Sequence, residues 1–204
     1  MPRSLTPFFG RERDLGEIGR RVVDPDYPLI TVVGEGGIGK TRLALEVARQ
    51  VNEYFADGVW FVSLVDVRAL SHADSEPSTP GHEFDRLAVA IGQSIQMAFG
   101  GGSSPVSQLL AYLRDKELLL VLHNFEHLVP AAGFVADLVQ AAKGVTLLIT
   151  SRQRLDLQME WIYRLQGLPV PERPPASASA KAQPWSSLQL FAERAARRLD
   201  GLAL

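Results

Sequence analysis

The sequence feature that most constrains the fold is a glycine-rich run, GEGGIGKT, at residues 34–41. It satisfies the pattern G-x-x-x-x-G-K-[ST]. A short apolar run, residues 29–33, precedes it, and residues 40–55 follow with Leu43, Val47 and Val51 on one helical face. Strand, loop and helix are the context that a phosphate-binding loop requires. A glycine-rich turn that holds no ligand is the alternative interpretation.

The chemistry of such a loop depends on its backbone and on two side chains. Successive N–H groups surround phosphate oxygens, and the positive end of the following helix adds to the attraction. Lys40 would place a point charge between the β- and γ-phosphates, and Thr41 would place its hydroxyl on Mg²⁺. The run therefore predicts a site for the phosphates of a nucleotide.

The rest of the chain alternates apolar runs with segments of helical period. Three further strands are predicted at residues 59–64, 118–122 and 146–150. Helices are predicted at residues 83–98, 105–113 and 130–143, the second opened by Ser104 and Pro105 and the third closed by Gly144. This alternation is typical of an α/β fold, in which helices flank a mostly parallel sheet.

Composition excludes several classes of protein. The 204 residues are 46% hydrophobic and 22% charged, which is ordinary for a chain that buries a core. A net charge of -2 gives no general attraction to nucleic acid or anionic lipid. The lack of cysteine excludes a thiol nucleophile and Cys-ligated zinc. Because no apolar run approaches the length of a membrane span and no signal peptide opens the chain, we expect a cytoplasmic protein with no membrane partner.

The predicted organisation has three parts. Residues 1–166 form a P-loop nucleotide-binding domain. Residues 167–185 form a Pro-rich linker or loop, since they hold five of the thirteen prolines. Residues 186–204 hold a C-terminal amphipathic helix and then stop inside the apolar phrase GLAL, so we expect further domains after Leu204.

Five segments, taken in order, resemble a known family. They are FFGRE at residues 8–12, GEGGIGKTRLALEVA at 34–48, LLLVLHNFEHL at 118–128, LLITSRQRL at 147–155 and SLQLFAERA at 187–195. The chain resembles the STAND class of signal-transduction P-loop NTPases, and in particular the NB-ARC-like ATPase domains of bacterial transcriptional regulators. The resemblance implies a molecular switch that ADP keeps closed and ATP allows to open.

The resemblance also implies roles for individual residues. The Gly10-Arg11 turn would contact the adenine, and Arg152 would detect the γ-phosphate. Arg152 has independent support, because ligands of open parallel sheets bind beyond the carboxyl ends of the strands; a solvated surface arginine is the alternative. The expected nucleotide-binding residues are Phe9, Gly10, Arg11, Gly34, Gly36, Gly37, Ile38, Gly39, Lys40, Thr41 and Arg42.

The chain departs from the family pattern after the strand at residues 118–122. The family has an Asp there that holds Mg²⁺, and this chain has His123. Imidazole is a poor substitute, since Mg²⁺ prefers oxygen ligands, although a protonated ring would replace part of the metal's charge. Asn124 cannot act as a base, and Glu126 is either a carboxylate that orients water or one with no catalytic role. Natural divergence and an engineered substitution both account for His123.

Residues 123–127 also match H-x-x-E-H, the inverted pattern of a zinc peptidase. In those enzymes both histidines share one helical face. Here His123 closes a strand and Pro130 follows soon after, so we expect His127 to be a surface or capping residue.

Three functions compete at this point. The first is an ATP-hydrolysing switch, and the second is a nucleotide-binding interaction module that hardly hydrolyses, which His123 favours. The third, a small-molecule kinase, lacks an evident acceptor site. We expect adenine nucleotide and other domains of the same protein as partners, DNA contact only through those domains, and a monomeric chain.

Overall fold

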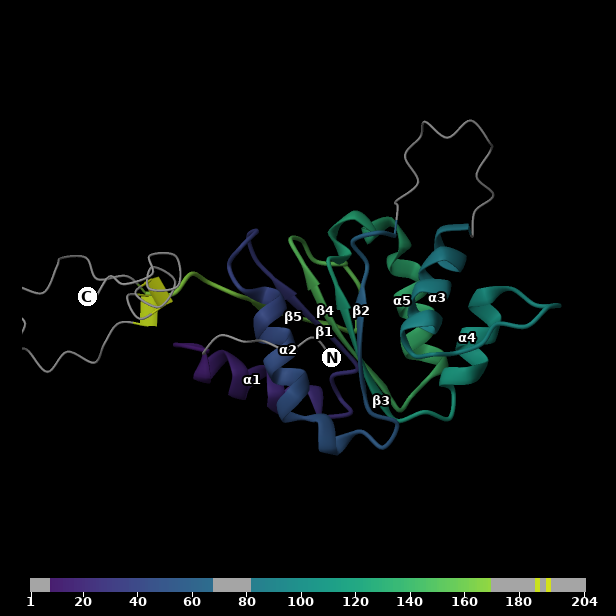
Figure 1. Ribbon diagram of the computed structural model, residues 1–204, viewed down its shortest axis with the longest axis horizontal. Coiled ribbons are helices and arrows are strands. Elements are labelled where there is room, and N and C mark those ends of the chain that lie inside the picture. Colours follow the sequence, from purple (N-terminus) through teal and green to yellow (C-terminus); the bar gives the residue numbers. More distant parts are fainter. Residues whose placement is uncertain (1–7, 68–81, 170–185, 188–189, 192–204) are drawn as a thin grey trace, which may run out of the picture.

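The computed structural model describes residues 8–67, 82–169, 186, 187, 190 and 191. It contains a five-stranded sheet with helices on both faces, as Figure 1 shows. The strands are β1 (Leu29–Val33), β2 (Val59–Ser63), β3 (Leu118–His123), β4 (Val145–Ser151) and β5 (Glu160–Arg164). Their order is β2-β3-β4-β1-β5, and every pair is parallel. The predicted α/β class with a parallel sheet is therefore confirmed.

The helices form two layers, each packed on one face of the sheet (Figure 1). The layer of α1 (Glu12–Val22) and α2 (Lys40–Gln50) packs on alternate residues of the strands, such as Ile30, Val121 and Leu148. The layer of α3 (His82–Ser94), α4 (Pro105–Leu113) and α5 (Ala132–Ala141) packs on the others, such as Leu120 and Ile149. In the described parts of the chain, none of the helices combines the length and the apolar character needed to cross a membrane.

Parallel pairing aligns the carboxyl ends of four strands at one edge of the sheet. Val33 pairs with both Ser151 and Arg164, and His123 pairs with Thr150. The segments that follow β1, β3, β4 and β5 therefore emerge side by side, and this is the edge at which open parallel sheets bind ligands.

Most of the predicted elements are present, with shifted ends. Ser104 caps α4 as predicted, because its hydroxyl accepts a hydrogen bond from the Ser107 N–H at 3.2 Å. The helix expected over residues 83–98 ends at Ser94, and Gln96 has a left-handed φ of 60°. The helix expected over residues 40–55 ends at Gln50, with a 3₁₀ turn (Asn52–Tyr54) after it.

The predicted role of Gly144 is wrong. α5 ends at Ala141, with Ala142 as its C-cap, and a 3₁₀ turn (Val129–Ala131) precedes its first residue. A Cβ built on Gly144 would lie 2.5 Å from the carbonyl oxygen of Lys116. Glycine is needed there because two backbone segments approach closely, and not because a helix ends.

Two elements, α1 and β5, have no counterpart in the sequence-based prediction. β5 is an edge strand with a charged residue at each end and half-buried residues between them, so it shows no continuous apolar run. Most of the predicted linker (167–185), most of the C-terminal helix (186–204) and the predicted loop at residues 71–81 lie outside the described residues.

Candidate functional site

The glycine-rich run joins β1 to α2, as the motif requires. Gly39 is the N-cap of α2 with a left-handed φ of 102°, which glycine adopts without steric cost. No side chain caps this helix, and its first turn holds no acidic residue. Its first backbone N–H groups are therefore available to an anion.

Lys40 lies over the start of the loop. Its Nζ donates hydrogen bonds to the carbonyl oxygens of Gly34 at 2.7 Å and Glu35 at 2.9 Å. Burial lowers the pKa of Lys40, the nearby Glu126 carboxylate opposes that shift, and Arg152 adds to it. Because an ammonium group has three donors, one N–H remains for a phosphate oxygen.

Thr41 does not face a carboxylate, because the residue opposite it is His123. The Thr41 Oγ1 lies 3.3 Å from the His123 Nδ1, and the Thr150 Oγ1 lies 2.9 Å from the same nitrogen. The Asn124 N–H donates to the Thr150 Oγ1 at 3.2 Å, which leaves the Thr150 hydroxyl proton for Nδ1. This arrangement is compatible with the neutral tautomer that carries its proton on Nε2.

The surroundings of His123 also favour the neutral ring. Desolvation by burial lowers its pKa, Lys40 adds to the shift, and Glu126 opposes it. The Phe61 ring stacks on the imidazole with centroids 5.7 Å apart. The structure therefore argues against a protonated His123 that replaces the charge of a metal.

The residues at this position do not fit Mg²⁺ held in the usual way. Mg²⁺ sites in nucleotide-binding proteins combine one or two carboxylates with phosphate oxygens. Here Thr41 supplies a hydroxyl, and His123 supplies a nitrogen that already contacts Thr150. Among the described residues, no cluster of three or more His, Asp or Glu side chains could hold a metal ion.

His127 has a structural role that accounts for its place in the H-x-x-E-H pattern. Its Nε2 donates to the carbonyl oxygen of Val67 at 2.8 Å, and its Nδ1 lies 3.3 Å from the side-chain nitrogen of Asn124. Since both ring nitrogens of His127 have partners, the arrangement does not support a zinc peptidase.

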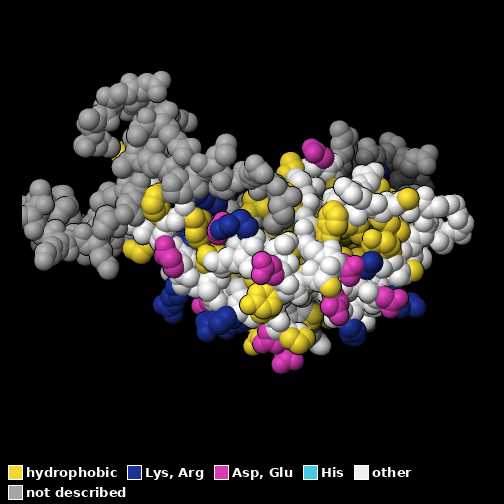
Figure 2. Space-filling view, turned by 60° about the horizontal axis from the view of Figure 1, so that its bottom comes forward, with side chains coloured by type: hydrophobic (Ala, Val, Ile, Leu, Met, Phe, Trp, Pro, Cys, Tyr) yellow, Lys and Arg dark blue, Asp and Glu magenta, His cyan; other side chains and the backbone are white. Residues whose placement is uncertain are grey.

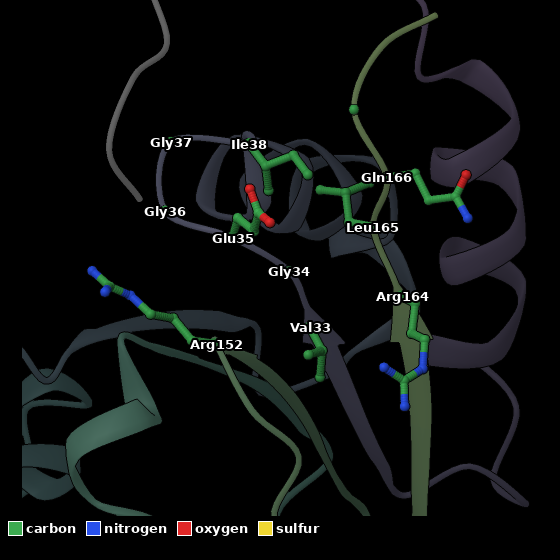
Figure 3. Close-up of a pocket in the computed structure, with 11 residues that line it drawn as sticks. Val33, Gly34, Glu35, Gly36, Gly37, Ile38, Arg152, Arg164, Leu165 and Gln166 are labelled. Atoms are coloured by element: carbon green, nitrogen blue, oxygen red, sulfur yellow. The ribbon is translucent and has the colours of Figure 1, made fainter.

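Arg152 and Glu126, predicted separately, lie in contact. Arg152 follows β4 directly, and Glu126 lies in a 3₁₀ turn (Phe125–His127) after β3. The Arg152 Nε is 3.1 Å from the Glu126 Oε1. A Cβ built on Gly36 would lie 3.7 Å from the Arg152 guanidinium, so this side chain reaches the phosphate loop, as Figure 3 shows.

The segment before α1, which lies in the same layer as α2, also contacts the loop. The Arg11 guanidinium donates to the carbonyl oxygen of Ile38 at 3.4 Å and pairs with Asp14 at 3.1 Å. The Tyr163 hydroxyl of β5 donates to Asp14, and burial together with this carboxylate raises the pKa of Tyr163. These contacts link edge strand β5 to the phosphate loop through α1.

The other predicted residues of this segment lie nearby. Phe9 is half-buried, and Gly10 has a left-handed φ of 67° just before α1. The Arg42 guanidinium lies over the Phe8 ring, 5.7 Å from its centroid. The structure thus places the N-terminal segment beside the first turn of α2.

Replacing Tyr163 with phenylalanine should lower the free energy of unfolding by about 1–2 kcal/mol, because Asp14 loses a hydrogen bond to a charged acceptor. Urea unfolding without nucleotide measures the change. Tyr27→Phe is the matched control, since the Tyr27 ring also packs on Trp161 but its hydroxyl has no hydrogen-bond partner among the described residues. Equal losses in both variants would contradict a role for the Asp14 contact.

An open pocket of about 920 Å³ adjoins the loop, within the size range of ligand pockets. Arg152 and Arg164 lie on opposite sides of it in Figure 3. The lining residues are Val33, Gly34, Glu35, Gly36, Gly37, Ile38, Arg152, Arg164, Leu165, Gln166 and Gly167. Sequence analysis missed Arg164, Leu165 and Gln166 because it missed β5, which ends at Arg164 and leads directly into the other two residues.

Comparison with known proteins identifies regulatory relatives, although no family model matches the chain. An uncharacterized protein of Mycobacterium tuberculosis is 29% identical over 203 residues, which is 99% of this chain and 44% of that protein. A putative HTH-type transcriptional regulator of the same organism is 27% identical over 177 residues, which is 86% of this chain and 17% of the regulator. The chain thus spans less than half the length of these curated relatives.

A solved structure supports the fold. The crystal structure of Cdc6p from Pyrobaculum aerophilum superposes with a TM-score of 0.57 and 17% sequence identity, covering 81% of this chain and 48% of that one. The predicted P-loop NTPase fold is confirmed. The similarity to a putative HTH-type transcriptional regulator agrees with the expected resemblance to bacterial transcriptional regulators.

Proposed function

We propose that the chain binds ATP and ADP and acts as the nucleotide-dependent switch domain of a transcription-regulatory protein. The observation that carries the proposal is the uncapped N-terminus of α2 beneath a loop that Lys40, Arg152 and Arg11 all contact or adjoin. Three cations from three parts of the chain at one anion-binding helix end favour a polyphosphate ligand. The regulatory relatives favour a switch over a metabolic role.

Hydrolysis by this domain is proposed to be slow. The position expected to hold a metal-binding Asp holds His123, whose pKa is lowered by burial, and Asn124 beside it has no acid–base function. The carboxylate of Glu126, which sequence analysis considered as a base, is paired with Arg152. A module that senses nucleotide occupancy without turnover is the second candidate, and the contact between Thr41 and His123 favours it.

Two measurements test the function. Isothermal titration calorimetry with ADP and ATP should show binding of both, and absence of binding would overturn the proposal. A turnover assay with ATP alone and with candidate small-molecule acceptors then separates a slow ATPase, a binding module and a kinase.

We further propose that the protein is cytoplasmic and that other domains of the same protein make its DNA contacts. The net charge of -2 supports this division of labour. On the face shown in Figure 2, lysines and arginines are interspersed with acidic residues, and hydrophobic side chains gather over the half that holds α3, α4 and α5. A surface of mixed sign does not attract a polyanion strongly.

The chain is expected to remain monomeric with either nucleotide. The charges on its visible face are mixed, and we assign assembly to other domains of the protein. Light scattering with ADP and with ATP should give a mass near 22.4 kDa. A stable oligomer that forms with one nucleotide would mean that this domain assembles by itself.

A further inference from the structure

The ion pair between Glu126 and Arg152 lies beside the phosphate loop, and its two side chains differ strongly in exposure. The Glu126 side chain is 20% exposed, whereas its partner Arg152 is 68% exposed. A second contact holds the same turn against the β4 end, since the Gln153 side chain donates to the Glu126 carbonyl oxygen at 3.3 Å. The backbone of the turn that carries Glu126 is thus held against the β4 end, and Arg152 is the more exposed partner of the ion pair.

The same carboxylate acts on the phosphate loop. Its charge opposes the lowering of the pKa of Lys40 and of His123 that burial causes, so the carboxylate acts electrostatically on both of these residues. Arg152 meanwhile adjoins Gly36 of the loop. A phosphate at this end of the loop would approach Arg152, which is already paired with Glu126. It would also approach the Glu126 carboxylate, which is negatively charged like the phosphate.

We propose that Glu126 competes with the terminal phosphate of the nucleotide for Arg152 and thereby sets the preference of the site for ADP over ATP. This inference rests on the proposed function. The loop N–H groups and Lys40 serve the phosphates that both nucleotides share. Only the additional phosphate of ATP has to draw Arg152 away from Glu126 and approach that carboxylate.

The competition follows from the chemistry of the guanidinium group. Its planar fork pairs best with a single carboxylate or phosphate at a time. A ligand shifts such an equilibrium only by its different affinity for the two arrangements. ATP binding is therefore coupled to breaking the ion pair between Arg152 and Glu126, and ADP binding is not.

The test uses Glu126→Gln, which removes the charge and keeps the shape. Calorimetry should show ATP binding at least about threefold tighter, because an exposed ion pair and a like-charge repulsion are both removed, with ADP affinity changed by less than about twofold. The matched control is Asp156→Asn, which removes one charge from the exposed pair between Arg154 and Asp156 and should leave both affinities unchanged.

A double-mutant cycle assigns the effect to Arg152. Arg152→Gln should weaken ATP binding more than ADP binding. In the Arg152→Gln background, the further change Glu126→Gln should no longer tighten ATP binding selectively. Glu126→Asp has a shorter side chain, which draws the carboxylate away from Arg152. It should shift the ratio of ATP affinity to ADP affinity in the same direction as Glu126→Gln, and it replaces Glu126→Gln in the test if the Gln variant does not fold.

The outcomes separate this inference from the proposed function. Suppose that the unmodified chain binds ADP, but that Glu126→Gln raises the affinities for ADP and ATP equally or changes neither affinity. The competition is then refuted, and the nucleotide site stands. If the selective gain persists without Arg152, Glu126 acts only through its charge, and the competition is again refuted. If the unmodified chain binds neither nucleotide, both proposals fail together.

Discussion

Replacing Lys40 with alanine is expected to weaken the binding of ADP and ATP by at least about 100-fold, since hydrogen bonds to charged groups contribute about 1.5–3 kcal/mol each and every 1.4 kcal/mol is a factor of ten. The lysine holds its charge over the loop through the carbonyl oxygens of Gly34 and Glu35. Alanine removes that charge and leaves the backbone N–H groups in place. Since alanine is the best helix former, α2 should keep its first turn.

Calorimetry with each nucleotide measures the loss, and urea unfolding checks that the fold is retained. Lys143→Ala is the matched control, because Lys143 is exposed near the start of β4, away from the loop. Unchanged affinity in Lys40→Ala would overturn the assignment of residues 34–41 as a phosphate-binding loop.

Replacing His123 with aspartate is expected to raise the rate of ATP turnover by about 100-fold, since metal-assisted charge neutralisation is worth several kcal/mol at a phosphoryl transition state. The carboxylate would lie beside Thr41 in place of the Nδ1 that now contacts it at 3.3 Å. It would add the oxygen ligand that Mg²⁺ prefers and that this position lacks. ATP affinity should therefore depend more strongly on Mg²⁺ in the variant.

Phosphate release during a Mg²⁺ titration measures both effects. His123→Asn is the control, because asparagine matches aspartate in size and has no charge, and it should leave turnover as slow as in the unmodified chain. If the unmodified chain already hydrolyses ATP as fast as His123→Asp, the carboxylate is dispensable and slow turnover has been wrongly attributed to this position.

The core of the fold could be predicted because its signals are local. Strands β1, β3 and β4 are mainly aliphatic and almost entirely buried, so each is visible in the sequence alone. The glycine-rich run fixes the turn from β1 into α2. β5 was missed for the opposite reason: as an edge strand it is half-exposed, and its residues Trp161 and Tyr163 pack against one face only.

The sequence by itself determined the phosphate loop, the α/β class and the unusual histidine after β3, because each depends on residue type and spacing along the chain. Only the tertiary structure decided what these residues contact. The pairing of Arg152 with Glu126, of His123 with Thr41 and Thr150, and of Tyr163 with Asp14 joins segments that are far apart in the sequence. Such contacts depend on the order of strands in the sheet and on the directions of side chains at its carboxyl edge. The local sequence pattern predicts neither of these.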